Sequence, residues 1–392
     1  MQTVQQSSIL KMIFSNTGLL VIALITSLLI ANSNYNDAFE TFLQTIIGFN
    51  IGNIHLKYNV ITWMNDGLMA IFFLMVGLEI KKELLEGQLS SVKKASLPIL
   101  AAIGGAVLPA LIYYFINKGT PTQNGWGIPM ATDIAFALAV ITALKDKVPS
   151  SLKVFLAALA IVDDLLAIIV IALFYSTGLH FDYLMMGLGV FIIQLICNRL
   201  GIKNLLVYLV LGSIMWYCIH HSGIHATIAG VLTAMAIPLR VASSSISPLE
   251  KLEHTLNIPV NYIIIPLFAL FNTNIKFESE MLDGLQQPLG LGIILGLLIG
   301  KSVGIFSTCF IATRLKIATM PEGANWKQIF GVGILGGIGF TMSIFVALLS
   351  FNEPHHIAAA KFCILIGSVM AAIIGYILLT LFRQKTLHKK IG

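Results

Sequence analysis

The chain has 392 residues, of which 57% are hydrophobic and only 11% are charged, and its mean hydropathy is +0.88. Soluble domains average about 45–50% apolar and 25% charged residues, so this composition excludes a water-soluble globular protein. The net charge of +6 does not indicate a nucleic-acid partner, because the basic residues lie in short clusters between apolar runs, as membrane topology requires. The four cysteines lie within apolar stretches without metal-ligand spacing, and no cofactor is expected.

Apolar segments follow one another along the chain, most of them near the ~20 residues that a helix needs to cross a bilayer. They cover residues 12–31, 59–80, 95–116, 124–143, 150–175, 182–198, 204–219, 223–239, 256–271, 289–313, 328–350 and 357–382. The segments 204–219 and 223–239 are short, and they form either a tight helical hairpin or one bent element. The sequence predicts an all-α integral membrane protein, a single transmembrane domain over residues 1–392 with about 12 helices.

Basic residues are distributed unevenly between the connections. If the N-terminus lies inside, most of the 24 Lys and Arg residues fall on inner connections and tails. The outer connections then hold only Lys57, Lys118, Lys276 and Lys361. Inner connections of membrane proteins carry an excess of Lys and Arg, so both termini are expected on the cytoplasmic side of a multi-pass protein.

The first outer connection has the alternating pattern of a β-ribbon. Ile47, Phe49 and Ile51 alternate with other residues before Gly52-Asn53, a plausible hairpin turn. A short β-hairpin over residues 45–58 is predicted, with an irregular loop as the alternative. Because an exposed strand edge is stabilised by pairing with a second copy, the segment is a candidate homodimer contact.

A few ionisable residues fall at bilayer depth, where each costs several kcal/mol and usually marks a pathway or binding site. They are Asp66, Glu79, Asp133, Asp163, Asp164, His225 and Lys301. Asp66 and Glu79 lie near the two ends of their span, where an interfacial position is equally compatible with the pattern. The other residues lie deeper.

Asp163 and Asp164 are adjacent within one span, so their side chains project about 100° apart and cannot both be satisfied by one neighbour. Lys301 is the only basic residue deep enough to pair with one of them. Glycines recur every four residues along the Lys301 helix, which indicates that another backbone approaches it closely. These glycines are Gly292, Gly296, Gly300 and Gly304.

Two spans carry helix-breaking residues. Asp133 stands in NGWGIPMATDIAFALAV (124–140), after Pro129 and Thr132, and the second segment is the glycine-rich FGVGILGGIGFTMSIFVALL (330–349). Interrupted spans in the two halves of a transporter are the best sequence indication of a midplane site built from discontinuous helices. The half-helix ends would carry partial charges, which Asp133 and Lys301 are available to offset.

This set of groups favours exchange of a small cation for protons. Carboxylates, a hydroxyl and opened backbone carbonyls are hard oxygen ligands suited to a small hard cation. Protons and the cation compete for the same oxygens, so a site open alternately to each side would exchange one for the other.

From about Ser15 to Arg383 the sequence resembles the bacterial sodium/proton antiporters of the NhaA type. The resemblance rests on NDGLMAIFFLMVGLEIKKEL (65–84), IPMATDIAFAL (128–138), LAIVDDLLAI (159–168), SGIHATIAG (222–230), LEH (252–254), IPLFAL (265–270), GKSVGI (300–305) and GVGILGGIGFTMSIF (331–345).

The resemblance implies a twelve-helix fold with inverted repeats, approximately 59–175 and 256–382, and two discontinuous crossing helices. It implies a transporter of the bacterial inner membrane, not an enzyme, that exchanges external protons for internal Na+ or Li+ in pH and sodium homeostasis. Activation toward alkaline pH and a homodimer contact through residues 45–58 are implied as well. We hypothesise that about two protons, shared among Asp163, Asp164 and Lys301, enter for each Na+ that leaves.

By resemblance, Asp164 binds the ion and exchanges protons, while Asp163 pairs with Lys301 and releases it on ion binding. Thr132 and Asp133 line and balance the crossing, and Asp163, Asp164 and Thr132 form the Na+ site. A pH-responsive group maps to Glu79, Lys82, Glu83, Glu253 and His254, with His225 near the opposite side. The sequence departs from the family pattern at Asn257, where a histidine is common, and at Glu250, where a basic residue is common.

Other functions fit the residues less well. A symporter for an organic anion would use Lys301 as the anion contact. An intramembrane aspartyl enzyme would need two aspartates facing each other, whereas adjacent Asp163 and Asp164 point in different directions and no Gly-x-Gly-Asp signature is present. A purely structural membrane scaffold would not need several deep ionisable groups.

Overall fold

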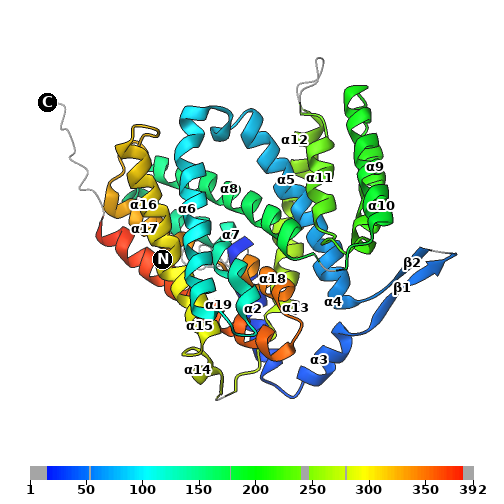
Figure 1. The fold of residues 1–392 in the computed structure, drawn as a ribbon, viewed down its shortest axis with the longest axis horizontal. Helices are drawn as coiled ribbons and strands as arrows, with labels where there is room; N and C mark the ends of the chain where they lie inside the picture. Colours follow the sequence, from blue (N-terminus) through cyan, green and yellow to red (C-terminus); the bar gives the residue numbers. More distant parts are fainter. Residues whose placement is uncertain (1–15, 53, 177, 240–246, 279, 383–392) are drawn as a thin grey trace, which may run out of the picture. The chain divides into compact units, whose positions relative to one another are not determined.

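The computed structural model describes residues 16–52, 54–176, 178–239, 247–278 and 280–382. In this part of the chain the regular structure is helical apart from one two-stranded sheet (Figure 1). The chain forms two compact units: unit 1 comprises Met1–Gly87 and Ile168–Glu278, and unit 2 comprises Gln88–Ala167 and Ser279–Gly392. The two chain ends and Arg240, on which the predicted orientation partly depends, lie outside the described residues.

Unit 1 combines the hairpin with apolar helices. Its elements are α2 (Asn16–Ala31), α3 (Asn36–Leu43), β1 (Ile46–Ile51), β2 (Ile54–Asn59), α4 (Val60–Thr62), η1 (Trp63–Leu68), α5 (Met69–Leu85), α9 (Phe181–Arg199), α10 (Leu205–His221), α11 (Ile228–Ala236), α12 (Pro248–Pro259), η5 (Val260–Ile264) and α13 (Ile265–Asn272). A buried cluster that includes Leu78, Tyr208 and Leu249 joins α5, α10 and α12.

Unit 2 contains the longer spans. Its elements are η2 (Gln88–Ser90), α6 (Val92–Asn117), η3 (Gln123–Met130), α7 (Ile134–Ala143), η4 (Lys145–Lys147), α14 (Glu280–Gly284), α15 (Pro288–Leu295), η6 (Gly296–Gly300), α16 (Lys301–Arg314), α17 (Trp326–Gly336), α18 (Phe340–Ser350) and α19 (Pro354–Leu381). Most of α8 (Ser150–Phe174) also belongs to it. The largest buried cluster includes Leu156 of α8, Leu335 of α17 and Leu379 of α19.

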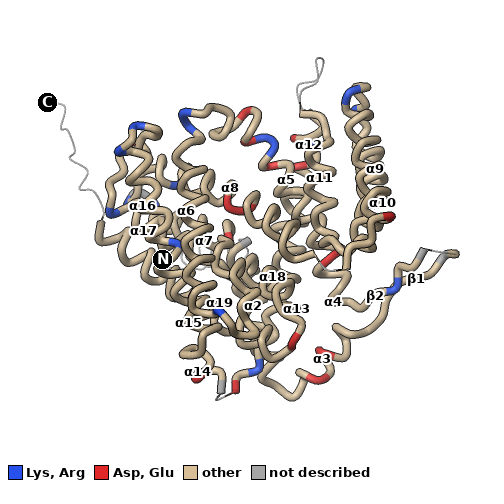
Figure 2. The backbone as a smooth tube through the Cα atoms, in the orientation of Figure 1, with Lys and Arg blue, Asp and Glu red and all other residues tan. Residues whose placement is uncertain are grey.

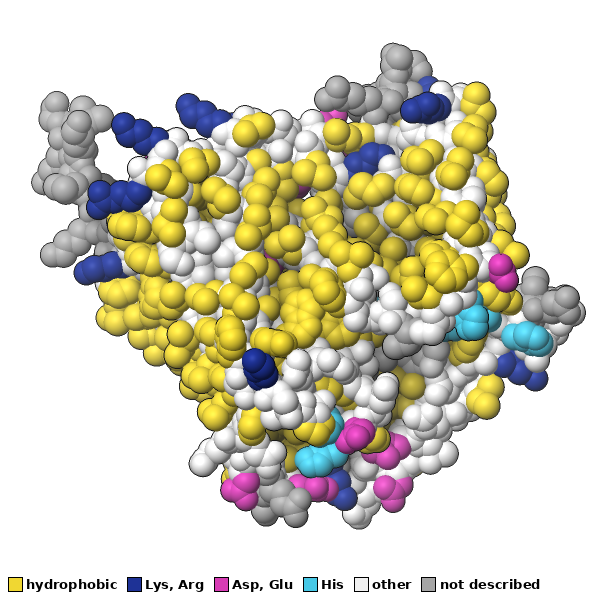
Figure 3. Space-filling view, in the orientation of Figure 1, with side chains coloured by type: hydrophobic (Ala, Val, Ile, Leu, Met, Phe, Trp, Pro, Cys, Tyr) yellow, Lys and Arg dark blue, Asp and Glu magenta, His cyan; other side chains and the backbone are white. Residues whose placement is uncertain are grey.

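The apolar helices account for most of the predicted spans. Among the described residues, eight helices are long and apolar enough to cross a membrane, or up to ten if two bent helix pairs each count as one span. The predicted segments 204–219 and 223–239 correspond to α10 and α11, which have only 17 and nine residues. Figure 3 shows hydrophobic side chains over α6, α15 and α16, as expected for surfaces that face lipid.

The charge count assigns Lys361 to an outer connection, although this residue falls within the predicted apolar segment 357–382. It lies inside α19, which begins at Pro354, a few residues before the apolar run starts. Proline is favoured in the first turn of a helix because its fixed backbone angle suits the helix and its missing N–H needs no partner there. The helix therefore begins earlier than hydropathy indicates.

The predicted β-hairpin is confirmed. β1 and β2 pair in antiparallel register from Ile46 opposite Asn59 to Ile51 opposite Ile54. Gly52 at the turn has a φ of 56°, a left-handed conformation that glycine adopts at little cost. The indole N–H of Trp63 donates to the carbonyl of Ile47 at 3.0 Å and attaches the hairpin to the span that follows it.

The short helix α11 is held by glycines and by a lysine. A Cβ atom on Gly230 would collide with the carbonyl oxygen of Ala70, and one on Gly77 would lie 2.7 Å from the Cβ of Ala234. At the end of α11, Lys81 donates to the carbonyl oxygens of Met235 and Ile237 at 2.6 and 2.5 Å. These contacts stabilise carbonyls that a helix end leaves without intrahelical partners.

Candidate ion-exchange site

The first predicted break is present in unit 2. Residues Gln123–Met130 form a 3₁₀ helix, and the α-helix resumes only at Ile134. Proline at position 129 lacks a backbone N–H, and Thr132 and Asp133 follow it in the interruption between the two helices. Backbone groups in the interruption therefore lack the hydrogen bonds that a continuous helix would supply.

The second predicted break is also present. α17 ends at Gly336, α18 begins at Phe340, and the two helices meet at 47°. A Cβ atom on Gly337 would collide with the carbonyl oxygen of Leu297, so the close approach of η6 requires glycine here. The bend frees the carbonyls of the last turn of α17 from their helical bonds.

Hydrogen bonds join the two interruptions. The backbone N–H of Asp133 donates to the carbonyl of Ile338 at 2.6 Å, and the hydroxyl of Thr132 lies 2.8 Å from the carbonyl oxygen of Gly336. On the other side of the crossing, the hydroxyl of Ser343 donates to the carbonyl of Ile128 at 2.7 Å. The two broken spans therefore meet at their breaks.

Asp133 caps two helices at once. One carboxylate oxygen accepts the N–H of Phe136 at 3.1 Å in the first turn of α7. The other oxygen accepts the N–H of Thr341 at 3.1 Å and its hydroxyl at 2.5 Å in the first turn of α18. A negative charge at a helix N-terminus is stabilising, and here one buried carboxylate serves two such ends.

Whereas Asp133 lies at two helix N-termini, Lys301 lies beside a carbonyl at the C-terminal end of η3. Its amine is completely buried and contacts both a carboxylate oxygen of Asp163 and the carbonyl oxygen of Met130, the last residue of η3. A cation near the C-terminal carbonyls of a helix offsets their partial negative charge. Lys301 follows the π-helical turn Gly296–Gly300, a type of insertion that often marks functional sites.

The glycine stripe explains how Lys301 comes so close to the first break. A Cβ on Gly300 would lie 2.7 Å from the Cα of Pro109 in α6, and one on Gly296 would lie 2.6 Å from the Cβ of Pro129 in η3. The backbones that approach the Lys301 helix are thus those of α6 and η3. Any larger residue at these positions would separate Lys301 from the break.

Asp163 shares one oxygen between two donors. Its Oδ2 atom contacts the Lys301 amine and lies 2.6 Å from the hydroxyl oxygen of Thr132. Thr132 has a single hydroxyl proton, so it donates either to Asp163 or to Gly336, and its orientation depends on whether Asp163 carries a proton. Among the described residues, Oδ1 of Asp163 has no hydrogen-bond partner, which is unusual for a buried carboxylate oxygen.

Asp164 is the next residue of α8 and is as buried as Asp163, with 2% of its surface exposed. Figure 2 shows acidic positions part-way along α8, whereas Lys and Arg in unit 2 lie mostly near the ends of helices. Unit 2 thus brings together Thr132, Asp133, Asp163, Asp164 and Lys301. Their oxygen atoms and the freed carbonyls form a donor set suited to a small hard cation.

A family model described as Na+/H+ antiporter 1 matches residues 7–379. The chain belongs to this family. It is 57% identical over 367 residues to "Na(+)/H(+) antiporter NhaA 2" of Flavobacterium johnsoniae, covering 93% of this chain and 90% of the relative. It is also 48% identical to "Na(+)/H(+) antiporter NhaA" of Haemophilus ducreyi, over 95% of each chain. The protein of the same name from Helicobacter pylori is 44% identical over 93% of each chain. This antiporter family consists of transporters, not enzymes.

The antiporter residues predicted to respond to pH fall into two places in unit 1. Glu79, Lys82 and Glu83 lie on α5, and Glu253 and His254 lie on α12, where Lys82 pairs with Glu253 at 2.8 Å. Glu250, a departure from the family pattern, forms a capping box with Ser247 at the start of α12, which accounts for an acidic residue at this position.

His225 is not part of that group. It lies 3.4 Å from Asp66, which precedes Glu79 by 13 positions along η1 and α5, or about 20 Å of helix. The Lys82–Glu253 pair therefore joins the predicted residues of α5 to those of α12, whereas His225 belongs to a second group around Asp66.

Sequence reasoning missed three hydroxyl residues of the crossing. Thr341 and Ser343 contact the other broken span, and the hydroxyl of Ser368 in α19 accepts the N–H of Phe340 at 3.1 Å. Serine and threonine within helices usually bond to their own backbone, so their presence in a span gives no signal of a partner. Only the position of Thr341 and Ser343 directly after the glycine run could have indicated them.

Proposed function

We propose that this chain is a secondary active transporter that exchanges Na+ for protons across a membrane. One observation carries the proposal. Where the two broken spans meet, one carboxylate oxygen of Asp163 contacts both the Lys301 amine and the Thr132 hydroxyl, and Asp164 is the next residue of the chain. Such oxygens bind Na+ and protons in competition. The names of relatives at 44% to 57% identity, which are Na+/H+ antiporters, support it.

In the proposed cycle, Asp164 binds the ion and exchanges protons. Na+ that reaches Asp163 and Thr132 competes with the Lys301 amine for the same carboxylate, so Lys301 is released as the ion binds. Asp133 remains a cap for α7 and α18 throughout and keeps the crossing balanced, because both of its oxygens are already occupied. Na+ and protons bind to the same oxygen atoms. After the site has released Na+ on one side of the membrane, it therefore returns with protons bound. This makes the exchange obligatory.

The proposed exchange is electrogenic. About two protons, shared among Asp163, Asp164 and Lys301, enter for each Na+ or Li+ that leaves, so one net positive charge moves inward per cycle. An inside-negative membrane potential then contributes about 2.3 kcal/mol per 100 mV to extrusion. In reconstituted vesicles, Na+ efflux should accelerate when a potential of this sign is imposed. A rate that is independent of the potential would contradict the stoichiometry.

We propose that the described helices are part of one transporter domain over residues 1–392, with about 12 spans and inverted repeats over approximately 59–175 and 256–382. One interrupted span in each repeat supports this, namely η3 with α7 and α17 with α18. The basic connections support cytoplasmic termini. The proposal also includes a location in the bacterial inner membrane and a role in pH and sodium homeostasis.

The β-hairpin over residues 45–58 is the proposed homodimer contact. Ile46, Ile47 and Phe49 of β1 expose more than half of their surface, and the two-stranded sheet has open edges. Pairing with a second copy would cover such an edge. The apolar faces of the spans would contact membrane lipid.

A pH response is assigned to Glu79, Lys82, Glu83, Glu253 and His254, and to His225 at its separate position. The Lys82–Glu253 pair supports this, because its side chains are 39% and 20% exposed and can exchange protons with solvent. Exchange activity is expected to rise toward alkaline pH, as the resemblance to the family implies.

An organic-anion symporter is not favoured. The anion contact in that case is Lys301, but its buried amine already contacts Asp163 and the carbonyl oxygen of Met130. In vesicles loaded with Na+, proton counter-transport without any added anion distinguishes the antiporter from the symporter.

The experiment that tests the proposed function is Na+-dependent pH change in everted vesicles that contain the full chain, from about pH 6 to about pH 9. Addition of Na+ should release protons from energised vesicles, and Li+ should do the same. Vesicles without the protein are the control. The absence of a response to either ion at every pH would overturn the proposal.

A further inference from the structure

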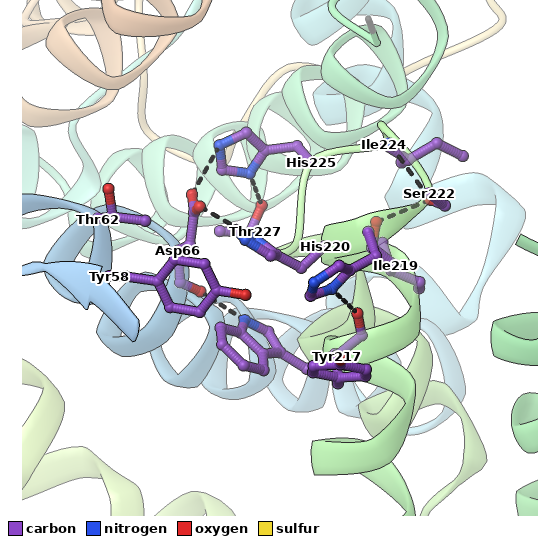
Figure 4. Close-up of polar contacts among 12 residues, drawn as sticks. Tyr58, Thr62, Asp66, Tyr217, Ile219, His220, Ser222, Ile224, His225 and Thr227 are labelled. Atoms are coloured by element: carbon purple, nitrogen blue, oxygen red, sulfur yellow. Dashed lines mark hydrogen bonds and ion pairs between the residues drawn. The ribbon is translucent and has the colours of Figure 1, made fainter. Parts of the chain in front are cut away.

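A second cluster of titratable groups lies in unit 1, whereas the ion-exchange residues belong to unit 2, and Figure 4 shows the contacts of this cluster. Asp66 in the π-helical turn η1 receives two imidazole rings. Nδ1 of His220 lies 3.2 Å from Oδ2 of Asp66, and Nε2 of His225 lies 3.4 Å from Oδ1. The side chains are only 11% to 20% exposed, so their charges are weakly screened by solvent.

The two histidines differ in what surrounds the rest of the ring. Nδ1 of His225 lies 2.8 Å from the hydroxyl of Thr227, so a neutral His225 can accept from Thr227 and donate to Asp66. The ring of His220 instead stacks on the indole of Trp216, with centroids 5.6 Å apart and planes 18° apart. A protonated ring in that position gains a cation–π contact as well as a charged contact with Asp66.

The stacked rings of His220, Trp216 and Trp63, here called the aromatic column, contact the β-hairpin. Trp216 stacks on Trp63 at 5.9 Å, and the indole N–H of Trp63 donates to the carbonyl of Ile47 in β1. The ring of Tyr58 in β2 forms T-shaped contacts with His220 and Trp63, with centroids 4.8 and 5.7 Å apart. His220 therefore contacts the hairpin directly through Tyr58 and indirectly through the column.

The other titratable groups around His220 do not oppose its protonation near neutral pH. Tyr58 and Tyr217 are uncharged there. His221, beside it in α10, lies with its Nδ1 atom 3.0 Å from the carbonyl oxygen of Tyr217, an arrangement that suits a neutral ring donating this hydrogen bond. His225 is satisfied as a neutral ring by Thr227 and Asp66, which leaves Asp66 as the one charged neighbour in the described cluster.

We propose that His220, held between Asp66 and Trp216, is a second proton-binding site, and that proton binding there strengthens the attachment of the β-hairpin to unit 1. Its ligand is the proton alone, and the transported cation takes no part. The imidazolium of His220 is attracted to the Asp66 carboxylate and to the Trp216 ring. These attractions fix the His220 ring in the position where Tyr58 packs against it. Loss of the proton removes the cation–π contact with Trp216 and leaves only a neutral hydrogen bond to Asp66, which loosens the contact with β2.

The test is hydrogen exchange of the hairpin backbone in the purified full-length protein, followed by mass spectrometry from about pH 5.5 to about pH 8.5 and corrected for the intrinsic pH dependence of exchange. After correction, amides of residues 46–59 should exchange about fivefold more slowly at the acidic end. The readout requires no transport, so its outcome is independent of the proposed function.

Two variants and one matched control make the assignment specific. His220→Gln should remove the pH dependence, and so should His220→Phe, which keeps an aromatic ring against Trp216 but cannot bind a proton. His221→Gln, a change at the neighbouring histidine that does not contact Asp66, should retain it. Unchanged pH dependence in both His220 variants, a transition lost only in His221→Gln, or pH-independent exchange in the wild type would each overturn the proposal.

Discussion

Each unit contains a lysine paired with a carboxylate, and the two pairs differ in their surroundings. In unit 2 the side chains of Lys301 and Asp163 are 0% and 1% exposed, and each also contacts the crossing. In unit 1 the side chains of Lys82 and Glu253 are 39% and 20% exposed. Both pairs join a lysine amine to a carboxylate, so the burial and the additional partners decide what each pair can do.

The comparison shows that the free-energy cost of separating a charge pair depends on its burial. Separating buried partners leaves an uncompensated charge in a low-dielectric interior, whereas solvent and salt replace the partner of an exposed charge. An ion that takes Asp163 from Lys301 therefore changes the energy of the whole crossing. Loss of the Lys82–Glu253 contact changes mainly the local charge.

The largest expected effect is on transport in Asp164→Asn. The substitution keeps the size of the side chain but removes the charge that would bind Na+, so exchange should fall at least ~100-fold. Na+-driven proton movement in proteoliposomes measures the loss. Asp182→Asn, which changes an exposed aspartate at the start of α9, is the matched control and should retain activity. Full exchange in Asp164→Asn would refute the site.

Lys301→Met should produce the largest loss of stability. It leaves the Asp163 carboxylate buried without its cationic partner, which lowers the free energy of unfolding by about 3 kcal/mol. The double variant Lys301→Met, Asp163→Asn removes both charges and should recover most of that loss, although it should not transport. Thermal unfolding in detergent measures both variants. Equal stability of the single and double variants would show that the pair is not coupled.

Asp133→Ala should have an intermediate effect, because α7 and α18 both lose a capping carboxylate. Replacing one capping residue costs ~1 kcal/mol, so two caps predict a loss of about 2 kcal/mol. Asp133→Asn keeps a capping oxygen and should lose less. If the two variants were equally stable, the carboxylate would not act as the shared cap. The same unfolding assay applies.

Lys82→Met should have the smallest effect on stability, within about 1 kcal/mol of the wild type, because the pair is partly exposed. Its effect should instead appear as a shift in the pH dependence of exchange. Parallel measurements of unfolding and of Na+-driven proton movement separate the two. A loss as large as that of Lys301→Met would remove the distinction between the pairs.

Much of the fold could be predicted from local sequence. Alternating Ile47, Phe49 and Ile51 before Gly52 predicted the hairpin, because strand periodicity and a left-handed turn depend only on neighbouring residues. Pro129 and the glycines near Gly337 predicted the two breaks for the same reason. Hydropathy overestimated α11, because it measures apolar content and not where the helical backbone begins.

The candidate site was predictable as a set of residues but not as a set of contacts. Asp163, Asp164 and Lys301 are conspicuous in any apolar span, since burial of a charge is costly wherever it occurs. Thr341, Ser343 and Ser368 are ordinary residues of a helix and became relevant only through what lies opposite them. The same holds for the carbonyl oxygens of Met130 and Gly336, which every sequence contains.

The sequence by itself determined that this is a membrane protein and which few charges must be buried in it. The tertiary structure decided which partner each charge has. Lys301 meets Asp163 across 138 positions of chain, and Thr341 meets Asp133 across 208. The cost of burying a charge is a property of one residue and its neighbours. The group that offsets this cost is set by how distant helices pack, and here glycines allow those helices to approach.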